Sequence, residues 1–208
     1  MSEESKYERG IHYNVLNQRF TLIEDTLEMW DKYKKLDNKF RKLLEELITG
    51  NIVIEIGPGS SPQTSLFQFN PKEYICVEPT PRRGYQKFPD FFRYVESEDM
   101  FNGPDGLSYL ETVPDNSVVV LSSGVFDNFI LPNKEYVEKL VETIYQKTIP
   151  GGLTFHTFEG NHKPIFPLKG FELELVVQYT TEITMEEGLF KSKKPNLIMV
   201  PAFFRKPE

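Results

Sequence analysis

The stretch VIEIGPGSSP, Val53 to Pro62, decides how the rest of the sequence is interpreted. Apolar residues surround one glutamate, Glu55, and run directly into two glycines, two serines and a proline. This is the pattern of a buried strand, a tight turn and the start of a helix, because glycine permits the turn and proline suits a first helical turn. In an open parallel sheet, the turn after the first strand lies beside the ligand. The stretch therefore predicts both a fold class and a binding site.

The sequence after residue 50 predicts strands that alternate with helices. Continuous apolar runs, typical of strands buried on both faces, occur at 51–56, 73–78, 92–95, 117–122 and 153–158. Helical patterns fall between them at 62–69 and 134–147. Two further strands, 171–179 and 196–204, have no useful helix between them, so we expect them to form an antiparallel pair at one edge of the sheet. The alternation predicts an α/β fold with a doubly wound, mostly parallel sheet.

The first fifty residues follow the helical period instead. Apolar side chains recur every three or four positions from Leu16 to Ile48, and Gly50 is a suitable helix stop. We therefore divide the chain into an N-terminal helical cap, residues 1–50, and one compact domain, residues 51–208. Because the sheet's own helices are expected to cover both of its faces, we expect the cap to roof the pocket at the carboxyl ends of the strands. Packing on the flank of the sheet is the alternative.

Composition narrows the class of protein. A net charge of −7 argues against a broad nucleic-acid-binding surface, so a small-molecule substrate is favoured over nucleic acid or protein. No apolar run approaches the roughly 20 residues of a membrane span, and the polar N-terminus does not resemble a signal peptide. We expect a cytoplasmic protein without membrane contact. Its one cysteine, Cys76, lies in an apolar run and is expected to be buried and inert.

Glu55 discriminates between two kinds of ligand. A dinucleotide pyrophosphate prefers a bare helix N-terminus and usually a third glycine, but Pro62 stands there and Glu55 would add negative charge. S-adenosylmethionine (SAM) carries an ammonium and a sulfonium group, which a carboxylate attracts. A second acid, Glu78, ends the next strand, where it can accept hydrogen bonds from both ribose hydroxyls. Glu78 fits SAM and NAD equally and indicates only a nucleoside, whereas Glu55 favours SAM. A surface Glu55 and an ordinary strand-end Glu78 remain alternatives.

In this order and spacing, the motifs resemble those of class I SAM-dependent methyltransferases. EIGPGSSP resembles the glycine-rich first motif and CVEP the acidic end of the second strand. DNSVVVLSSGVFDNF resembles the fourth strand with its loop, and TIPGGLTFHTF the turn into the fifth strand. The resemblance runs from about Asn51 to the C-terminus. It implies a seven-stranded sheet of order 3-2-1-4-5-7-6 with strand 7 antiparallel. The segment 159–170 departs from the family because it is too short for the usual crossover helix.

The resemblance also implies the residues that contact SAM. They lie in and before the turn after the first strand and at the ends of the second, third and fourth strands. They are Glu55, Gly57, Pro58, Gly59, Ser60, Glu78, Pro79, Asp99, Met100, Ser122 and Ser123. Among them, Asp99 and Met100 are expected to border adenine, and Ser122 and Ser123 to face the methyl group. A solvated acidic turn is the alternative for Asp99.

Two residues are candidates for catalysis. Asp127 follows the fourth strand and could bind a substrate amine or accept a proton, unless it only turns the chain. His162 follows the fifth strand and could act as a general base, whereas His156, within that strand, is expected to be a satisfied core residue. The histidines do not occur at metal-ligand spacing, so no metal is predicted.

The implied activity is methyl transfer from SAM to an O, N or S nucleophile. SAM brings its own leaving group, so positioning and exclusion of water could suffice without a base. A catalytically inactive SAM-binding partner or regulatory protein is the first alternative, and an NAD-dependent oxidoreductase is the second.

Overall fold

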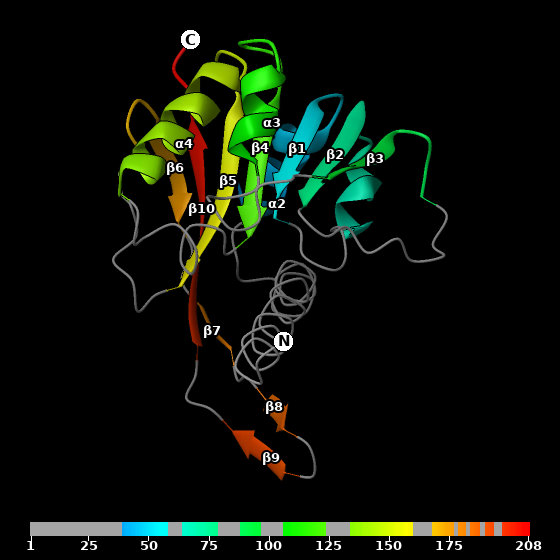
Figure 1. The fold of residues 1–208 in the computed structure, drawn as a ribbon, viewed down its shortest axis with the longest axis vertical. Helices are drawn as coiled ribbons and strands as arrows, with labels where there is room; N and C mark the ends of the chain where they lie inside the picture. Colours follow the sequence, from blue (N-terminus) through cyan, green and yellow to red (C-terminus); the bar gives the residue numbers. More distant parts are fainter. Residues whose placement is uncertain are drawn as a thin grey trace, which may run out of the picture.

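One mixed β-sheet forms the centre of the molecule, with helices on both faces (Figure 1). The computed structural model describes residues 39–57, 64–78, 88–96, 106–123, 134–159, 168–176, 179–181, 184–187, 190–193 and 197–208. The strands of the sheet are ordered β3-β2-β1-β4-β5-β10-β6, and β7 pairs with β10 outside this path. With β10 in the place of the seventh strand, the predicted order 3-2-1-4-5-7-6 is confirmed.

The parallel part of the sheet matches the predicted apolar runs to within two residues. Its strands are β1 (Ile52–Ile56), β2 (Glu73–Glu78), β3 (Phe92–Glu96), β4 (Val119–Ser123) and β5 (Leu153–Glu159). These five strands pair in parallel with one another. Their side chains are mostly buried because helices cover both faces, which explains why the runs are continuously apolar.

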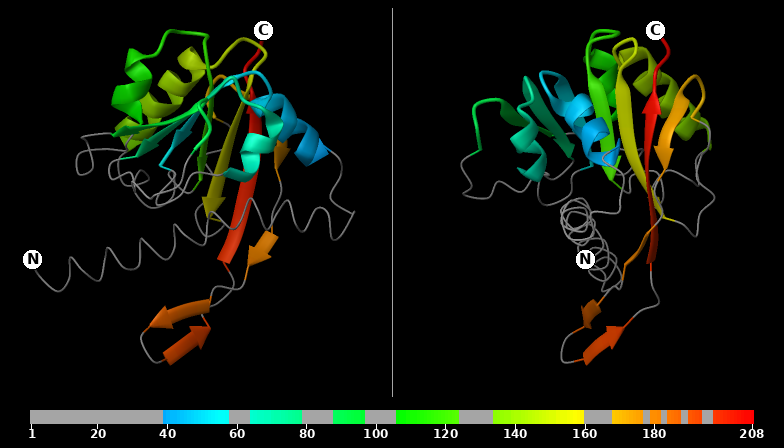
Figure 2. Two further views of the ribbon diagram at one scale, coloured as in Figure 1. Left: turned by 90° about the vertical axis from the view of Figure 1, so that its right-hand side faces the viewer. Right: turned by 180° about the vertical axis from the view of Figure 1, so that it is seen from behind.

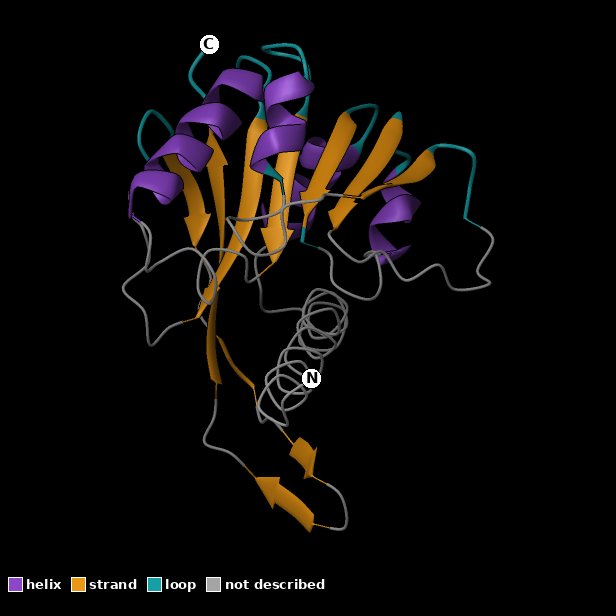
Figure 3. Cartoon of the chain, in the orientation of Figure 1, coloured by secondary structure: helices purple, strands orange, loops and turns teal. Residues whose placement is uncertain are grey.

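The antiparallel part of the sheet is more divided than the sequence suggested. β10 (Leu197–Arg205) pairs antiparallel with β5 and with β6 (Glu172–Val176), as expected. The expected single strand at 171–179 instead gives β6 and the short β7 (Tyr179–Thr181), which pairs with the first residues of β10. β8 (Thr184–Glu187) and β9 (Phe190–Lys193) form a separate two-stranded sheet, which lies beyond the carboxyl edge of the main sheet (Figure 3).

The described helices cover both faces of the sheet (Figure 2). α3 (Leu107–Thr112) and α4 (Lys134–Lys147) share a core cluster with Ile54 and Ile56 of β1. α2 (Lys39–Ile48) and the 3₁₀ helix η1 (Thr64–Phe69) share the opposite cluster with Val53. Because successive side chains of a strand point to opposite faces, Glu55 belongs to the α2/η1 face.

α2 is the part of the predicted N-terminal cap that the structure describes. Its five apolar side chains, from Phe40 to Ile48, are all buried, and the ring of Phe40 meets Phe155 and Phe203 edge-on at centroid distances of 6.1 and 5.3 Å. This part of the cap packs on a face of the sheet, beside the 3₁₀ helix in the described part of the first crossover. A roof over the pocket stays a prediction for the remainder of the cap. Gly50, at φ 69°, follows the helix end as predicted. Residues 1–38 lie outside the described residues.

No helix within the described ranges combines the length and the apolar character needed to cross a membrane.

Candidate cofactor site at the carboxyl edge of the sheet

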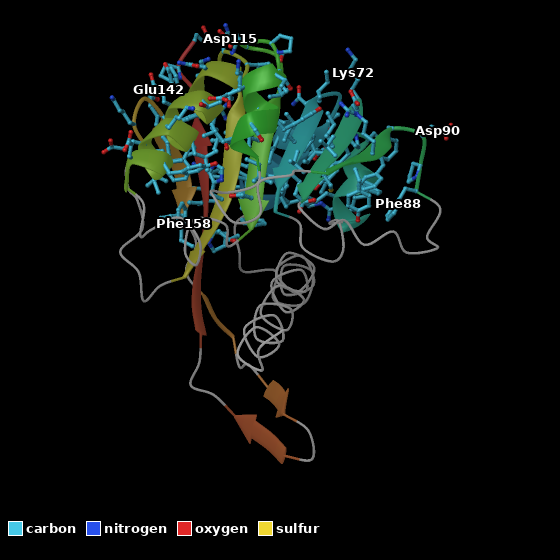
Figure 4. The ribbon with its side chains drawn as sticks, viewed as in Figure 1. Lys72, Phe88, Asp90, Asp115, Glu142 and Phe158 are labelled. Carbon is cyan, nitrogen blue, oxygen red and sulfur yellow. The ribbon has the colours of Figure 1, made fainter. Side chains whose placement is uncertain are left out.

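The sheet has a topological switch point between β1 and β4. The chain lays β2 and β3 on one side of β1, then crosses over to place β4 and β5 on the other side. In such sheets, ligands bind beyond the carboxyl ends of the strands at this point. Figure 4 gives the polarity: Phe158, near the end of β5, marks the carboxyl edge, whereas Lys72 and Asp115 lie at the opposite edge. The switch point therefore defines where a site is expected.

Strand register brings three predicted residues to one level at this edge. Ile56 of β1 is paired with Val77 of β2 and with Ser122 of β4. The next residue on each of the three strands, in the order β2, β1 and β4, stands one step closer to the edge; these are Glu78, Gly57 and Ser123. Glu78 and Ser123 follow Gly57 in the sequence by about twenty and sixty-five positions, yet the three residues form one row across the switch point.

Gly57 begins the turn in a conformation that favours glycine. Its φ is 63°, in the left-handed region, where a side chain adds strain. Its N–H donates a hydrogen bond to the carbonyl of Val77 at 3.0 Å, so the turn stays tied to β2 as it leaves the sheet. The glycine predicted from the sequence is therefore required by the backbone. Pro58, Gly59 and Ser60 lie outside the described residues.

The Glu55 carboxylate is fully buried inside the α2/η1 face. Its Oε2 accepts hydrogen bonds from the hydroxyl of Tyr74 at 2.9 Å and from the thiol of Cys76 at 3.3 Å, both on β2. Burial raises the pKa of Tyr74 well above its ordinary value, and the neighbouring Glu55 charge raises it further. The phenol therefore stays a donor. Glu55 is not the surface residue of the alternative reading; its contact with a ligand stays a prediction.

Ser122 belongs to a second buried polar group, on the α3/α4 face. Its Oγ lies 2.8 Å from Nδ1 of His156, and Nε2 of His156 lies 2.6 Å from Oγ1 of Thr154. The Thr154 hydroxyl donates its one hydrogen to the carbonyl of Val120 at 2.7 Å, so it accepts from Nε2–H. Burial lowers the pKa of His156 to about 3, which leaves the ring neutral. Nδ1 is then unprotonated and accepts from Ser122.

This Ser–His contact is not a nucleophile with its base. A general base works best with a pKa near the working pH, whereas the pKa of His156 is about 3. Ser122 is also only 1% exposed. Within the described part, His156 is the satisfied core residue that the sequence predicted. Its partner Ser122 combines a place beside the switch point with a fixed hydroxyl.

Several predicted residues are placed only by their backbone or lie outside the described ranges. Glu78 and Ser123 have described backbone positions, given above. Outside the described residues lie Pro79, Asp99, Met100, Asp127 and His162. Their predicted roles stay predictions. Among the described residues, no three His, Cys, Asp or Glu side chains are grouped so as to hold a metal ion.

Two residues near the site were missed by the sequence reasoning. Glu96 ends β3 in register with Glu78, three residues before the predicted Asp99. The signal was present in YVESED, but the expected strand ended one residue early. Gly106, before α3, approaches β1 so closely that a Cβ there would lie 2.6 Å from Cγ2 of Ile56. Because α3 itself was not predicted, nothing pointed to this contact.

Comparison with solved structures supports the architecture. The N-methyltransferase NodS from Bradyrhizobium japonicum WM9 superposes with a TM-score of 0.57 at 16% identity, over 83% of this chain and 99% of that one. A Pyrococcus horikoshii protein, provisionally described as an RNA methyltransferase, gives 0.55 at 16% identity, over 82% and 85%. A methyltransferase from Pyrococcus furiosus gives 0.51 at 18% identity, over 82% of each chain.

No protein-family model and no curated protein matches this chain. At these identities the structural likeness establishes the fold. The strand order, the antiparallel β10 and the neighbours agree: the chain has the Rossmann-like fold of class I SAM-dependent methyltransferases.

Proposed function

We propose that this protein is a SAM-dependent methyltransferase that transfers a methyl group to an O, N or S nucleophile of a small molecule. The row of Glu78, Gly57 and Ser123 across the switch point carries the proposal. It combines a strand-end acid for a ribose, a turn that requires glycine and a polar strand end on the far side of the crossover. These features match, in order along the edge of the sheet, the parts of a nucleoside that carries a short charged tail.

The chemistry of the row fits SAM. At φ 63°, Gly57 begins a turn that a side chain would strain, in keeping with close approach of backbone to ligand. Glu78 offers two acceptor oxygens for the two ribose hydroxyls. Glu55 adds a buried carboxylate two residues before Gly57, where its charge favours a cation and disfavours a pyrophosphate. This set of groups argues for SAM and against NAD.

When bound, SAM supplies an activated methyl group on a sulfonium leaving group. The residues of this chain then have to bind the cofactor, orient it toward the methyl acceptor, and exclude water from the site. Tyr74 and Cys76 support the first two tasks indirectly, because their hydrogen bonds stabilise the Glu55 charge. Asp127 and His162 remain the candidates for taking up a substrate proton. A small-molecule acceptor is favoured by the net charge of −7, which opposes a phosphate backbone.

Calorimetric titration with a ligand panel tests the cofactor assignment. SAM and its demethylated product S-adenosylhomocysteine should bind, whereas NAD should not. Binding of NAD alone would replace the proposal with an oxidoreductase.

A turnover assay then separates an enzyme from a binding protein. The protein is incubated with SAM and a pool of small metabolites, and S-adenosylhomocysteine formation is followed by mass spectrometry. Turnover above a no-pool control supports the enzyme. Cofactor binding without turnover on small-molecule, protein or RNA pools favours the inactive partner protein.

A further inference from the structure

Gly106, the N-cap residue of α3, lies against the last residue of β1. Its carbonyl accepts the N–H of Leu110 at 2.8 Å, which fixes it to the first turn of the helix. A Cβ at Gly106 would lie 2.6 Å from Cγ2 of Ile56, and 2.9 Å from both its Cγ1 and its Cδ1. Gly106 is buried, and Ile56 is 1% exposed. The start of α3 therefore reaches β1 because residue 106 has no side chain.

Space, rather than backbone conformation, accounts for this glycine. The φ angle of Gly106 is −152°, outside the left-handed region that favours glycine. Ile56 cannot simply turn away from an added Cβ, because two heavy atoms branch from its own Cβ and rotation about χ1 exchanges one branch for the other. A sideways shift of Ile56 would disturb its pairing with Val77 of β2 and Ser122 of β4. An added side chain would thus have to displace α3 or move the end of β1.

α3 is held in place as well. The side chains of Leu107 and Leu110 are buried in the same core cluster as Ile56. Interiors of this kind are close-packed, so a helix in such contact does not retreat without leaving a void. The strain of an added Cβ would therefore reach Ile56.

The position of Ile56 matters because the ligand-side turn starts at the next residue. Gly57 has a φ of 63° and donates its N–H to the carbonyl of Val77 at 3.0 Å. It also stands in the row with Glu78 and Ser123 across the switch point. A displacement of Ile56 would pass through one peptide bond to the start of this turn.

We propose that Gly106 is a positioning residue for the cofactor turn. By lacking a side chain, it lets α3 support Ile56, and Ile56 in turn holds Gly57 in place for ligand binding. This inference rests on the proposed function and deepens it, because it adds to the cofactor site a residue from a helix on the face of the sheet. Gly106 acts through Ile56 rather than through a ligand contact of its own.

Gly106→Ala and a matched control test this role. Gly152, in the turn before β5 at the opposite edge of the sheet, is also buried, and a Cβ there would lie 2.4 Å from Cγ1 of Ile149. Both Gly106→Ala and Gly152→Ala should therefore lower the melting temperature. At a temperature where both variants are folded, only Gly106→Ala should weaken S-adenosylhomocysteine binding in calorimetry. We expect a loss of about tenfold, because a misplacement of about 1 Å in a preorganised site can cost about a hundredfold.

Two further measurements separate positioning from a general loss of stability. Ile56→Ala removes all three atoms that an added Cβ would meet, so the effect of Gly106→Ala should change sign in this background. There the new methyl group fills part of the vacated space and should strengthen binding relative to Ile56→Ala alone. Independently of any ligand, the Gly57 amide should exchange its hydrogen faster in Gly106→Ala than in the wild type, because its bond to Val77 depends on the turn. Gly152→Ala should leave this exchange unchanged.

Two outcomes overturn the inference: equal S-adenosylhomocysteine affinities of the wild type and folded Gly106→Ala, or an equal loss in Gly152→Ala. If Gly106→Ala alone does not fold, the Ile56→Ala background decides, and a Gly106→Ala substitution that does not strengthen binding there overturns it. A wild-type protein that does not bind S-adenosylhomocysteine contradicts the proposed function itself. The amide exchange of Gly57 then decides whether Gly106 positions the turn, so the two failures are distinguishable.

Discussion

The hydroxyl of Tyr74 donates a 2.9 Å hydrogen bond to Oε2 of Glu55, and both side chains are fully buried. The two residues lie on neighbouring parallel strands, two residues apart in register, since Tyr74 is paired with Val53 and Cys76 with Glu55. A carboxylate inside an apolar cluster is stabilised only when donors meet it there. β2 supplies these donors to β1 just before the ligand-side turn.

The charge of Glu55 should affect SAM more than S-adenosylhomocysteine, because SAM carries one more positive charge. Glu55→Gln keeps the size and an acceptor but removes the charge. We expect the ratio of the two dissociation constants to shift against SAM by about threefold to tenfold, as measured by calorimetry. The control, Glu142→Gln, removes one negative charge from the exposed surface of α4. It should leave the ratio unchanged. An unaltered ratio in Glu55→Gln would remove the electrostatic argument.

Glu78 should matter for the ribose. Glu78→Ala removes acceptors for two hydroxyl groups, and each hydrogen bond to a charged group contributes about 1.5–3 kcal/mol. S-adenosylhomocysteine binding should weaken by at least about tenfold. Glu73→Ala is the matched control at the opposite end of β2, where Glu73 pairs with Arg93 at 2.6 Å on the surface. Its affinity should equal that of the wild type. Equal affinities in both variants would show that the ribose is held elsewhere.

Positive φ at two glycines gives a test of the turn. Gly57 and Gly50 have φ angles of 63° and 69°, and a Cβ at Gly50 would meet no heavy atom within 4 Å. Alanine at either position should lower the free energy of unfolding by about 1–2 kcal/mol, because both adopt the left-handed conformation. Only Gly57→Ala should also lose cofactor affinity. If the two variants bind S-adenosylhomocysteine alike, the turn at Gly57 does not approach the ligand.

His156 should make the protein less stable in acid. Its pKa is lowered from 6.5 to about 3, so the unfolded chain binds a proton below pH 6.5 that the folded protein refuses. The stability that His156 contributes is therefore present above pH 6.5 and is lost as the pH falls toward 3. Between pH 6 and 4, His156 alone should lower the free energy of unfolding by about 1.4 kcal/mol for each pH unit that the pH falls.

Urea unfolding at several pH values measures this slope. The difference between wild type and His156→Leu isolates the contribution of this residue, because the other titrating groups are common to both. Parallel pH profiles would mean that the ring is protonated inside the fold.

The parallel core could be predicted because each strand carries its own signal. Runs such as VVVL at 118–121 are apolar on both faces and cannot be stable in a half-exposed sheet. β2 and α4 have the expected bounds. The row at the switch point follows from these strands, since register places the residue after each strand at the same edge. Here local pattern and global fold agree.

The missed elements lack such a signal. α3 has six residues, and only Leu107 and Leu110 are buried among them, too few to show a period. β8 and β9 have four residues each and are rich in charged residues. The surface on which α2 packs could not be predicted from its apolar face. An amphipathic pattern shows that one face of a helix is buried, but it does not show which surface covers that face. The hydrogen bonds of Glu55 and His156 depend on pairings between strands, which no short stretch of sequence encodes.

β10 lies between β5 and β6, although it is made after both of them. During synthesis, β5 therefore leaves the ribosome with one edge unpaired, and it stays so until some forty residues more have been translated. β6 likewise has no place to dock in that interval. An unpaired, apolar strand edge is a template for association with other chains. The order of strands thus leaves an edge of the growing sheet open to association with other chains until β10 is complete.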